Sequence, residues 1–266
     1  MRLSPFLKGS VALHAAAVPA LAIAPHRWPY VAGALFADHC VILAAGLLPR
    51  STFLGPNLRR SSAAEAAGCV VLTFDDGPDP VVTPAVLDVL DARGARASFF
   101  CIGEHAARHR ELTAEIARRG HRLENHSSTH RNGFYFHRPA TLDREIGRCQ
   151  EELQRASGRA PTFFRAPAGI RSPLLEGALA RNGLRLASWT RRGFDTVSRN
   201  PAAVASRLTR GLRAGDVILL HDGACRARSG SAPVVLATLP LVLDAIEAAG
   251  LRTMPLLDDA AEPSRD

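Results

Sequence analysis

From residue 69 onward, short apolar runs rich in β-branched residues alternate with segments of helical periodicity. The helical segments span residues 83–93, 104–119, 139–157, 173–182, 201–213 and 231–249, and the seven runs are CVVLTF, ARASFF, HRLEN, TFFRA, LRLASW, DVILLH and LRTMPL. A helix between two strands returns the chain to the starting end of the sheet, so successive strands pair in parallel. The alternation therefore predicts an α/β fold, either a (β/α) barrel or a doubly wound sheet.

Two long apolar runs precede this alternation. They span residues 11–24 and 31–48 and are separated by the segment PHRWPY. The second run nears the ~20 residues that a helix needs to cross a bilayer, and the first reaches that length if its helix begins at Pro5. We therefore predict that residues 1–48 form a membrane-anchoring hydrophobic helical hairpin.

Polar residues in this hairpin leave two other interpretations open. Trp28 and Tyr30 in the connecting segment are typical of a membrane–water interface and favour the hairpin. Asp38 and His39 interrupt the second run, and charges are rare inside a membrane span. A signal-like anchor that is not cleaved and a buried pair of helices therefore remain alternatives.

The charge pattern around the hairpin bears on its orientation. Five basic side chains flank it and one lies in its turn: Arg2, Lys8, Arg50, Arg59 and Arg60 against Arg27. If both runs cross the bilayer, the positive-inside bias places the catalytic part in the cytoplasm. A single crossing would place it outside. We expect membrane association, at the inner membrane if the source is a Gram-negative bacterium.

The remaining composition narrows the domain organisation and the partners. The net charge is +8, but the first 60 residues carry six basic side chains against one acid, which leaves little basic excess for nucleic-acid binding elsewhere. Five cysteines without a C-x-x-C pair predict no disulfide framework and favour a reducing compartment. We expect a polar, turn-rich linker at 49–68, a catalytic domain at 69–257 and a tail at 258–266.

Uncommon polar residues follow several of the predicted strands directly. The carboxyl ends of parallel strands meet at one end of a barrel or sheet, where connecting loops carry the chemistry. The residues at these ends are Asp75 and Asp76, His126 and His130, Arg165, Asp195, and His221 with Asp222. One carboxylate and two imidazoles form a suitable ligand set for a divalent metal, and a second carboxylate can then accept a proton from water. We expect the other histidines, His105, His109, His121 and His137, at the surface.

The motifs TFDDGPD, HSSTH, RAPAG, FD and LLH occur in this order over residues 68–257. In this they resemble the polysaccharide deacetylases of carbohydrate esterase family four. The resemblance implies a distorted (β/α) barrel, often with seven strands, and metal-dependent hydrolysis of an amide or ester on a sugar. It implies Asp76, His126 and His130 as ligands of one divalent metal ion, with zinc expected and cobalt, nickel or manganese as alternatives.

The same resemblance assigns the catalytic and substrate-binding residues. It implies Asp75 as general base, oriented by Arg165, and His221 as general acid, held by Asp195. Three further residues are implied at the substrate: Leu219 against the acetyl methyl group, Pro167 in the RAPAG motif, and Trp189 as a stacking face or a core residue.

Two departures from the family pattern concern the substrate. Ala168 and Thr196 stand where family members commonly carry aromatic side chains that shape the sugar groove. We expect removal of an acetyl or other small acyl group from an amino sugar of a polysaccharide. The alternative is a deformylase or deacetylase of a lipid-linked sugar, and a third possibility is a carbohydrate-binding protein without catalysis. The last is disfavoured, because every ligand and proton-transfer position is filled.

Overall fold

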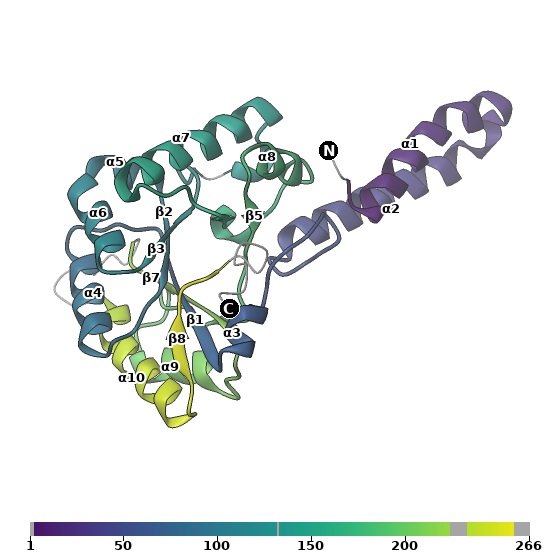
Figure 1. The fold of residues 1–266 in the computed structure, drawn as a ribbon. Helices are drawn as coiled ribbons and strands as arrows, with labels where there is room; N and C mark the ends of the chain where they lie inside the picture. The colour runs from purple at the N-terminus through teal and green to yellow at the C-terminus, as the bar shows by residue number, and fades with distance from the viewer. Residues whose placement is uncertain (1–2, 132, 224–232, 258–266) are drawn as a thin grey trace, which may run out of the picture.

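The computed structural model describes residues 3–131, 133–223 and 233–257, and within them eight strands form one parallel sheet (Figure 1). Its order is β5-β4-β3-β2-β1-β7-β6, and β8 pairs with the first half of β1. The strands are β1 (Cys69–Asp75), β2 (Ser98–Cys101), β3 (Arg122–Asn125), β4 (Phe163–Phe164), β5 (Arg185–Leu186), β6 (Arg191–Arg192), β7 (Val217–His221) and β8 (Arg252–Met254). All seven predicted strands form, and the predicted distorted (β/α) barrel class is confirmed. The predicted tail at 258–266 lies outside the described residues.

Helices before β1 and between successive strands surround the sheet (Figure 1). They are α3 (Ser62–Ala66), α4 (Val82–Ala92), α5 (Gly103–Arg108), α6 (Arg110–Arg118), α7 (Pro139–Ser157), α8 (Leu175–Arg181), α9 (Pro201–Thr209) and α10 (Val234–Ala248). The predicted helix at 104–119 is divided into α5 and α6, because His109 leaves the helical conformation at φ −119° and ψ 53°.

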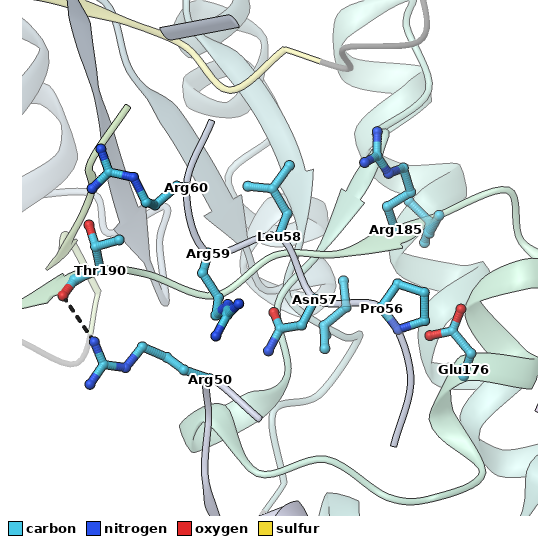
Figure 2. Close-up of a pocket in the computed structure, with 11 residues that line it drawn as sticks. Arg50, Pro56, Asn57, Leu58, Arg59, Arg60, Glu176, Arg185 and Thr190 are labelled. Atoms are coloured by element: carbon cyan, nitrogen blue, oxygen red, sulfur yellow. Dashed lines mark hydrogen bonds between the residues drawn. The ribbon is translucent and has the colours of Figure 1, made fainter. Parts of the chain in front are cut away.

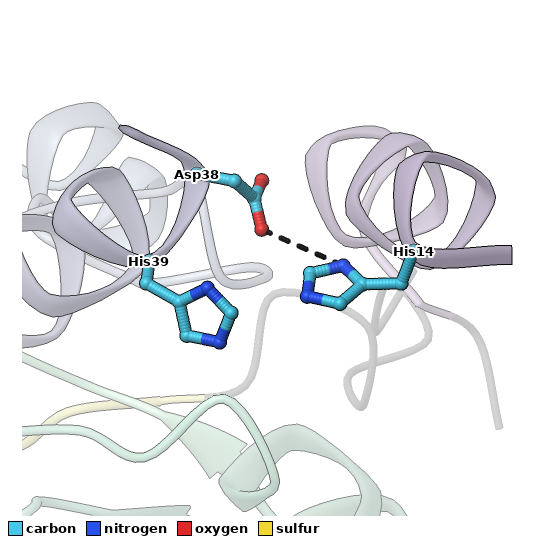
Figure 3. Close-up of side chains that lie close together, drawn as sticks. All are labelled: His14, Asp38 and His39. Carbon is cyan, nitrogen blue, oxygen red and sulfur yellow. Dashed lines mark ion pairs between the residues drawn. The ribbon is translucent and has the colours of Figure 1, made fainter. Parts of the chain in front are cut away.

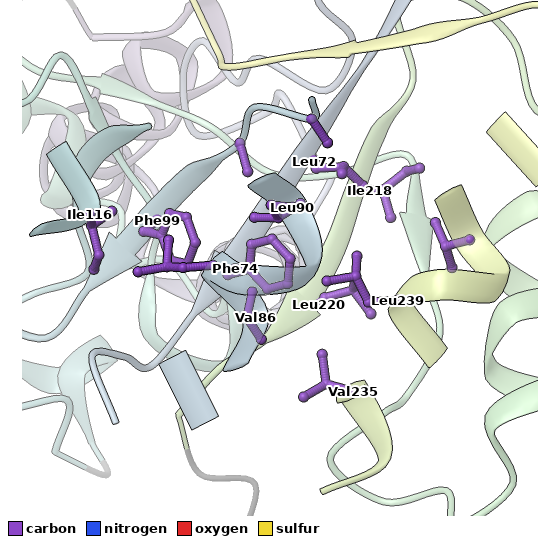
Figure 4. Close-up of a cluster of buried hydrophobic side chains, with 14 of the residues drawn as sticks. Leu72, Phe74, Val86, Leu90, Phe99, Ile116, Ile218, Leu220, Val235 and Leu239 are labelled. Carbon is purple, nitrogen blue, oxygen red and sulfur yellow. The ribbon is translucent and has the colours of Figure 1, made fainter. Parts of the chain in front are cut away.

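Side chains along β1 and β7 point alternately outward, to the apolar core beneath the helices, and inward, to the barrel interior where the predicted site residues lie. Val70, Leu72 and Phe74 point outward and join the apolar cluster beneath the helices, where the ring of Phe74 stacks on Phe99 at 5.0 Å (Figure 4). Successive side chains of a strand point to opposite faces, so Val71, Thr73 and Asp75 face the barrel interior. The same alternation on β7 places Val217, Leu219 and His221 inside. Both predicted proton-transfer residues thus come to the interior from neighbouring strands.

Residues of the predicted linker complete the side of the barrel that the strands leave open. Within the described chain, β5 and β6 end the sheet order and do not pair with each other. Leu58 accepts a hydrogen bond from the amide of Ser188 and donates to the carbonyl of Leu186. The amide of Ser61 donates to the carbonyl of Gly215, just before β7. Residues 58–61 therefore bridge β5 and the start of β7 across this opening.

Two antiparallel helices, α1 (Pro5–Ile23) and α2 (Trp28–Leu47), project from the barrel (Figure 1). Their polar side chains meet between the helices (Figure 3). Ser10 donates a hydrogen bond of 2.7 Å to the Asp38 carboxylate, and the His14 ring lies 3.9 Å from the same oxygen. The ring of His14 also meets that of His39 edge-on at 5.1 Å. Mutual pairing thus explains how two apolar helices tolerate Asp38 and His39.

His121 lies in the core rather than at the surface, which corrects the expectation for this residue. It is 4% exposed, packs edge-on against Phe99, and accepts a hydrogen bond from the amide of Ala97. Burial, with the charge of Arg96 added, lowers the pKa of His121 to about 4. The arginines around His121 in the sequence gave no sign of this burial, although His121 immediately precedes the strand that begins at Arg122.

This burial predicts a loss of stability in mild acid. The pKa is about 4 in the folded chain and about 6.5 in the unfolded one. The unfolded state therefore binds more protons between these values, and stability falls as pH drops below 6.5. His121 should contribute a loss of about 2 kcal/mol at pH 5. Urea unfolding at pH 7.5 and pH 5 measures this loss, and His121→Gln should show less of it; an equal loss in both proteins would contradict the assignment.

Candidate active site

The turn after β1 directs its two carboxylates into different surroundings. Asp75 is the last residue of β1, and Asp76 follows with a left-handed backbone, φ 75°. A non-glycine residue in this conformation is strained, and such strain is concentrated at functional sites. Gly77 comes next, and a Cβ there would overlap the Asp222 carboxylate. The left-handed residue and the glycine together shape the turn, in which oxygens of both carboxylates lie within 3.9 Å of Nε2 of His126.

The loop after β3 carries the two histidines of the HSSTH motif. Ser127 and His130 also have positive φ, 64° and 49°, and the Ser127 hydroxyl accepts a hydrogen bond from the amide of His130. Nδ1 of His126 lies 2.9 Å from the carbonyl oxygen of Arg165, to which it can only donate. A neutral His126 therefore has its lone pair on Nε2, the atom that faces Asp76.

Asp76, His126 and His130 form a compact cluster whose ligand atoms all lie within 4.8 Å of one another. Oδ1 of Asp76 is 3.3 Å from Nε2 of His126 and 3.4 Å from Nε2 of His130. This oxygen is buried and has no hydrogen-bond partner among the described residues. A buried, unpaired carboxylate oxygen facing two imidazole nitrogens fits a divalent cation.

The charges in this cluster favour an anionic carboxylate. Burial alone raises the pKa of Asp76, but the nearby ring of His126, with the charges of His126, His221 and His130, brings it well below its usual range. Burial lowers the pKa of His126, yet the charges of Asp75 and Asp76 outweigh burial and raise it. Burial and the charge of His126 lower the pKa of His130. The cluster is thus set to hold positive charge between its members.

Asp75 is held by a buried arginine. Nη1 of Arg165 donates to Oδ1 of Asp75 at 2.6 Å and to the hydroxyl of Thr73 at 2.8 Å. The same guanidinium donates to the carbonyls of Ala187 and Ser188 and lies 3.9 Å from the centre of the Phe100 ring. Oδ2 of Asp75 remains turned toward Nε2 of His126, 3.9 Å away. Arg165 therefore fixes one oxygen and leaves the other facing the cluster.

His221 ends β7, beside Asp75 in the register of the sheet. Its Nδ1 donates to Oδ1 of Asp195 at 2.9 Å, and its backbone amide donates to Oδ2 of Asp195 at 2.8 Å. Burial lowers the pKa of His221, but the hydrogen bond and charge of Asp195, with the charges of Asp75 and Asp76, outweigh burial and raise it. A positioned imidazole that holds its proton in this way is suited to act as an acid.

The three predicted substrate-binding residues lie in or beside the barrel interior. Leu219 and Trp189 belong to one buried apolar cluster, at 1% and 6% exposure. Pro167 is buried and begins the short 3-10 turn η3 (Pro167–Gly169), in which Ala168 takes φ 55°. The Trp189 ring lies 5.8 Å from the Arg165 guanidinium, so it packs close to this arginine.

Two further residues contact the site, and the sequence interpretation did not assign them. Nδ1 of His105 lies 2.9 Å from the carbonyl oxygen of Asp76, so this histidine supports the left-handed turn rather than lying free at the surface. Asp222 is fully buried, accepts a hydrogen bond of 2.6 Å from Thr83, and has a pKa that burial raises to about 7. His105 follows β2 closely and therefore lies at the same end of the barrel as Asp75, and this position in the sequence could have indicated that it lies near the site.

Comparison with known proteins identifies the family. A model of the polysaccharide deacetylase family matches residues 63–187. A chitooligosaccharide deacetylase of Bradyrhizobium sp. (strain ANU 289) is 35% identical over 155 residues, which cover 58% of this chain and 70% of that protein. The chain belongs to the polysaccharide deacetylase family.

Two solved structures of family 4 esterases share the fold of this chain over 70% of its length. A family 4 carbohydrate esterase from Streptomyces lividans, solved in complex with acetate, has a TM-score of 0.63 at 32% identity and covers 70% of this chain and 91% of its own. A family 4 acetyl xylan esterase from Clostridium thermocellum, solved with a cobalt ion, has a TM-score of 0.64 at 27% identity and covers 70% of this chain and 87% of its own.

Proposed function

We propose that the chain is a metal-dependent hydrolase that removes an acetyl or other small acyl group from an amino sugar. The observation that carries the proposal is the separation of the two adjacent carboxylates. Asp76 faces two imidazoles through an unpaired oxygen. Asp75 pairs with Arg165 and keeps a second oxygen toward the same place. Relatives named as chitooligosaccharide deacetylase and family 4 carbohydrate esterase support the reaction class.

The proposed metal ligands are Asp76, His126 and His130. When bound, a divalent cation supplies Lewis acidity, which makes water a better nucleophile and polarises the acyl carbonyl. Zinc suits this mixed set of nitrogen and oxygen ligands, and cobalt, nickel or manganese are alternatives. The hydrogen bond from His126 Nδ1 to the Arg165 carbonyl keeps the other ring nitrogen available and fixes the plane of the ring.

The two residues that transfer protons in this proposal are Asp75 on β1 and His221 on β7. Oδ2 of Asp75 takes a proton from the attacking water as its oxygen bonds to the acyl carbon, while Arg165 keeps the carboxylate in place. His221 then gives its proton to the sugar nitrogen as the carbon–nitrogen bond breaks. Asp195 stabilises the protonated imidazole and sets its orientation. The products are the free amine and the carboxylic acid. Asp75 then releases its proton to solvent and His221 takes one up from solvent, so both residues return to their starting protonation states.

The apolar lining of the interior limits the size of the acyl group. We assign Leu219 to the methyl group of the substrate, and Pro167 and Trp189 to the wall that supports the loop of Arg165. A lipid-linked amino sugar is a second candidate substrate beside a polysaccharide. The contacts of the helical hairpin with the loops after β3 and β4 favour it.

Acetate release from N-acetylated chitooligosaccharide tests the proposed reaction. We expect the full chain to release acetate when loaded with zinc or cobalt and to stop after treatment with a chelator. Restoring the metal should restore the rate. Binding of the oligosaccharide without acetate release, at any metal loading, would instead identify a carbohydrate-binding protein.

A further inference from the structure

The two N-terminal helices are apolar and nearly uncovered by the rest of the described chain. The segments Pro5–Ile23 and Pro25–Leu47 are 19 and 23 residues long, and only 11% of each apolar window is buried. A core helix of a water-soluble domain would be mostly covered. Trp28 and Tyr30, at the tip of the hairpin, are exposed as well. These lengths and exposures match the hydrocarbon core of a bilayer.

The base of the hairpin contacts the loops that carry the site. The carbonyl of Gly46, in the last turn of α2, accepts a hydrogen bond of 3.0 Å from the amide of Arg171, after β4. A Cβ on Gly46 would collide with the Tyr135 ring, in the loop after β3. Tyr135 is five residues from His130, a chain length of at most about 18 Å. The proposed metal site thus lies within a short loop of the membrane helices.

Several contacts join the hairpin to the segment that follows it, and that segment to the barrel. Ser4, before α1, donates a hydrogen bond of 2.6 Å to the carbonyl of Phe53. Leu7, Ala45 and Leu54 form a small buried cluster that joins both helices to the segment after α2. The buried Arg171 donates to the carbonyls of residues 51 and 55. A cleavable signal sequence would not be built into the domain in this way, so the hairpin sets the orientation of the barrel.

The surface around this base has the composition of a membrane interface. Four apolar side chains there are exposed: Leu47, Leu48, Phe53 and Phe136. Beside them lies an open cavity of about 820 Å³ whose charged lining includes four arginines and one glutamate (Figure 2). The arginines are Arg50, Arg59, Arg60 and Arg185. Arg60 is paired with Asp216, whereas Arg59 has no hydrogen bond or ion pair within the described part of the chain.

From these contacts we infer that the site opens at the membrane surface and acts on an amino sugar carried by a lipid through a phosphate linkage. The inference rests on the proposed function and specifies its substrate. A sugar on a lipid diffuses in the same bilayer as the hairpin, which raises its effective concentration at the site. The arginine cavity attracts the phosphate of that lipid at headgroup depth. Ala168 and Thr196, in place of the groove aromatics, suit a short sugar better than a long polymer.

A matched pair of substrates tests this inference. The full chain is placed in phosphatidylcholine nanodiscs that contain an N-acetylglucosamine disaccharide joined to a prenyl chain by a diphosphate, and its turnover is compared with that of the free disaccharide. We expect the lipid-linked form to react roughly 10²-fold faster at equal bulk concentration. Equal rates, or a faster free sugar, would overturn the inference and leave the proposed function intact. Turnover of neither substrate would count against the proposed function itself.

A charge reversal in the cavity examines the phosphate contact. Arg50→Glu combined with Arg59→Glu should lower the ratio of lipid-linked to free turnover at least tenfold. Arg118→Glu is the matched control, because this exposed arginine ends α6 and lies outside the lining of the cavity. A ratio unchanged by the double substitution would overturn the role assigned to the cavity.

The depth of the site can be measured without turnover. A fluorophore on Phe136→Cys, in a chain whose Cys40 and Cys225 are replaced by serine, should be quenched by lipids that carry a nitroxide at the headgroup. The same label on Arg118→Cys should not be quenched. An unquenched label at 136 would place the loop after β3 away from the bilayer and overturn the inference.

Discussion

Replacing His126 or His130 by alanine should leave the purified protein without its divalent metal and without measurable turnover. Each imidazole faces the one unpaired oxygen of Asp76, and removal leaves two ligands where a stable site needs three. The loss should exceed the roughly 10–100-fold that removal of an outer hydrogen-bond partner costs. Metal per chain by mass spectrometry and the rate of acetate release check the two effects separately.

A third histidine provides the control for this result. His109 lies at the junction of α5 and α6, away from the cluster, so His109→Ala should keep both metal and rate. Full metal occupancy in His126→Ala or His130→Ala would remove that residue from the proposed ligand set. Normal occupancy together with lost turnover would assign it a catalytic role instead.

Asp75→Asn should slow turnover by roughly 10²–10⁴-fold while the metal remains bound. Asparagine keeps an oxygen that can accept the hydrogen bond from Arg165 but cannot take the proton from water. The rate of acetate release and the metal content per chain check the two effects, and an activity near wild type would reject Asp75 as the base.

The alkaline limb of the pH–rate profile reports the ionisation of the proposed general acid, His221. His221 must carry its proton to donate it, and its raised pKa extends that condition to higher pH than an ordinary histidine allows. The rate should therefore fall as pH rises through a value above about 6.5. Asp195→Asn removes the carboxylate that supports the raised pKa, so the fall should begin at lower pH. An unchanged alkaline limb would separate Asp195 from the acid.

The spacing of polar residues at strand ends was sufficient to predict where the site lies. Parallel strands carry their carboxyl ends to one place, so residues as distant as Asp75 and His221 could be expected together. The structure pairs these two positions directly in the register of β1 and β7. The seven strands were predictable for a different reason, because each of them lies within an apolar run of the sequence.

Other features of the structure could not be predicted from the sequence. Strand β6 consists of Arg191 and Arg192, which carry no apolar pattern and pair only because β7 offers a free edge. His121 is buried although neighbouring residues in the sequence are polar, since the fold rather than local periodicity decides its surroundings. His105 acts on a backbone carbonyl, and a backbone contact has no counterpart in sequence spacing.

The segment that bridges the sheet edges determines where a soluble fragment of this protein could begin. Hydropathy alone would cut the chain just before Cys69, where the first strand starts. Such a cut removes Leu58 and Ser61, whose backbone groups bond to both sides of the opening. Exposed strand edges left behind pair with other chains and promote aggregation. An excised catalytic fragment should therefore begin upstream of Asn57 and carry part of the juxtamembrane segment with it.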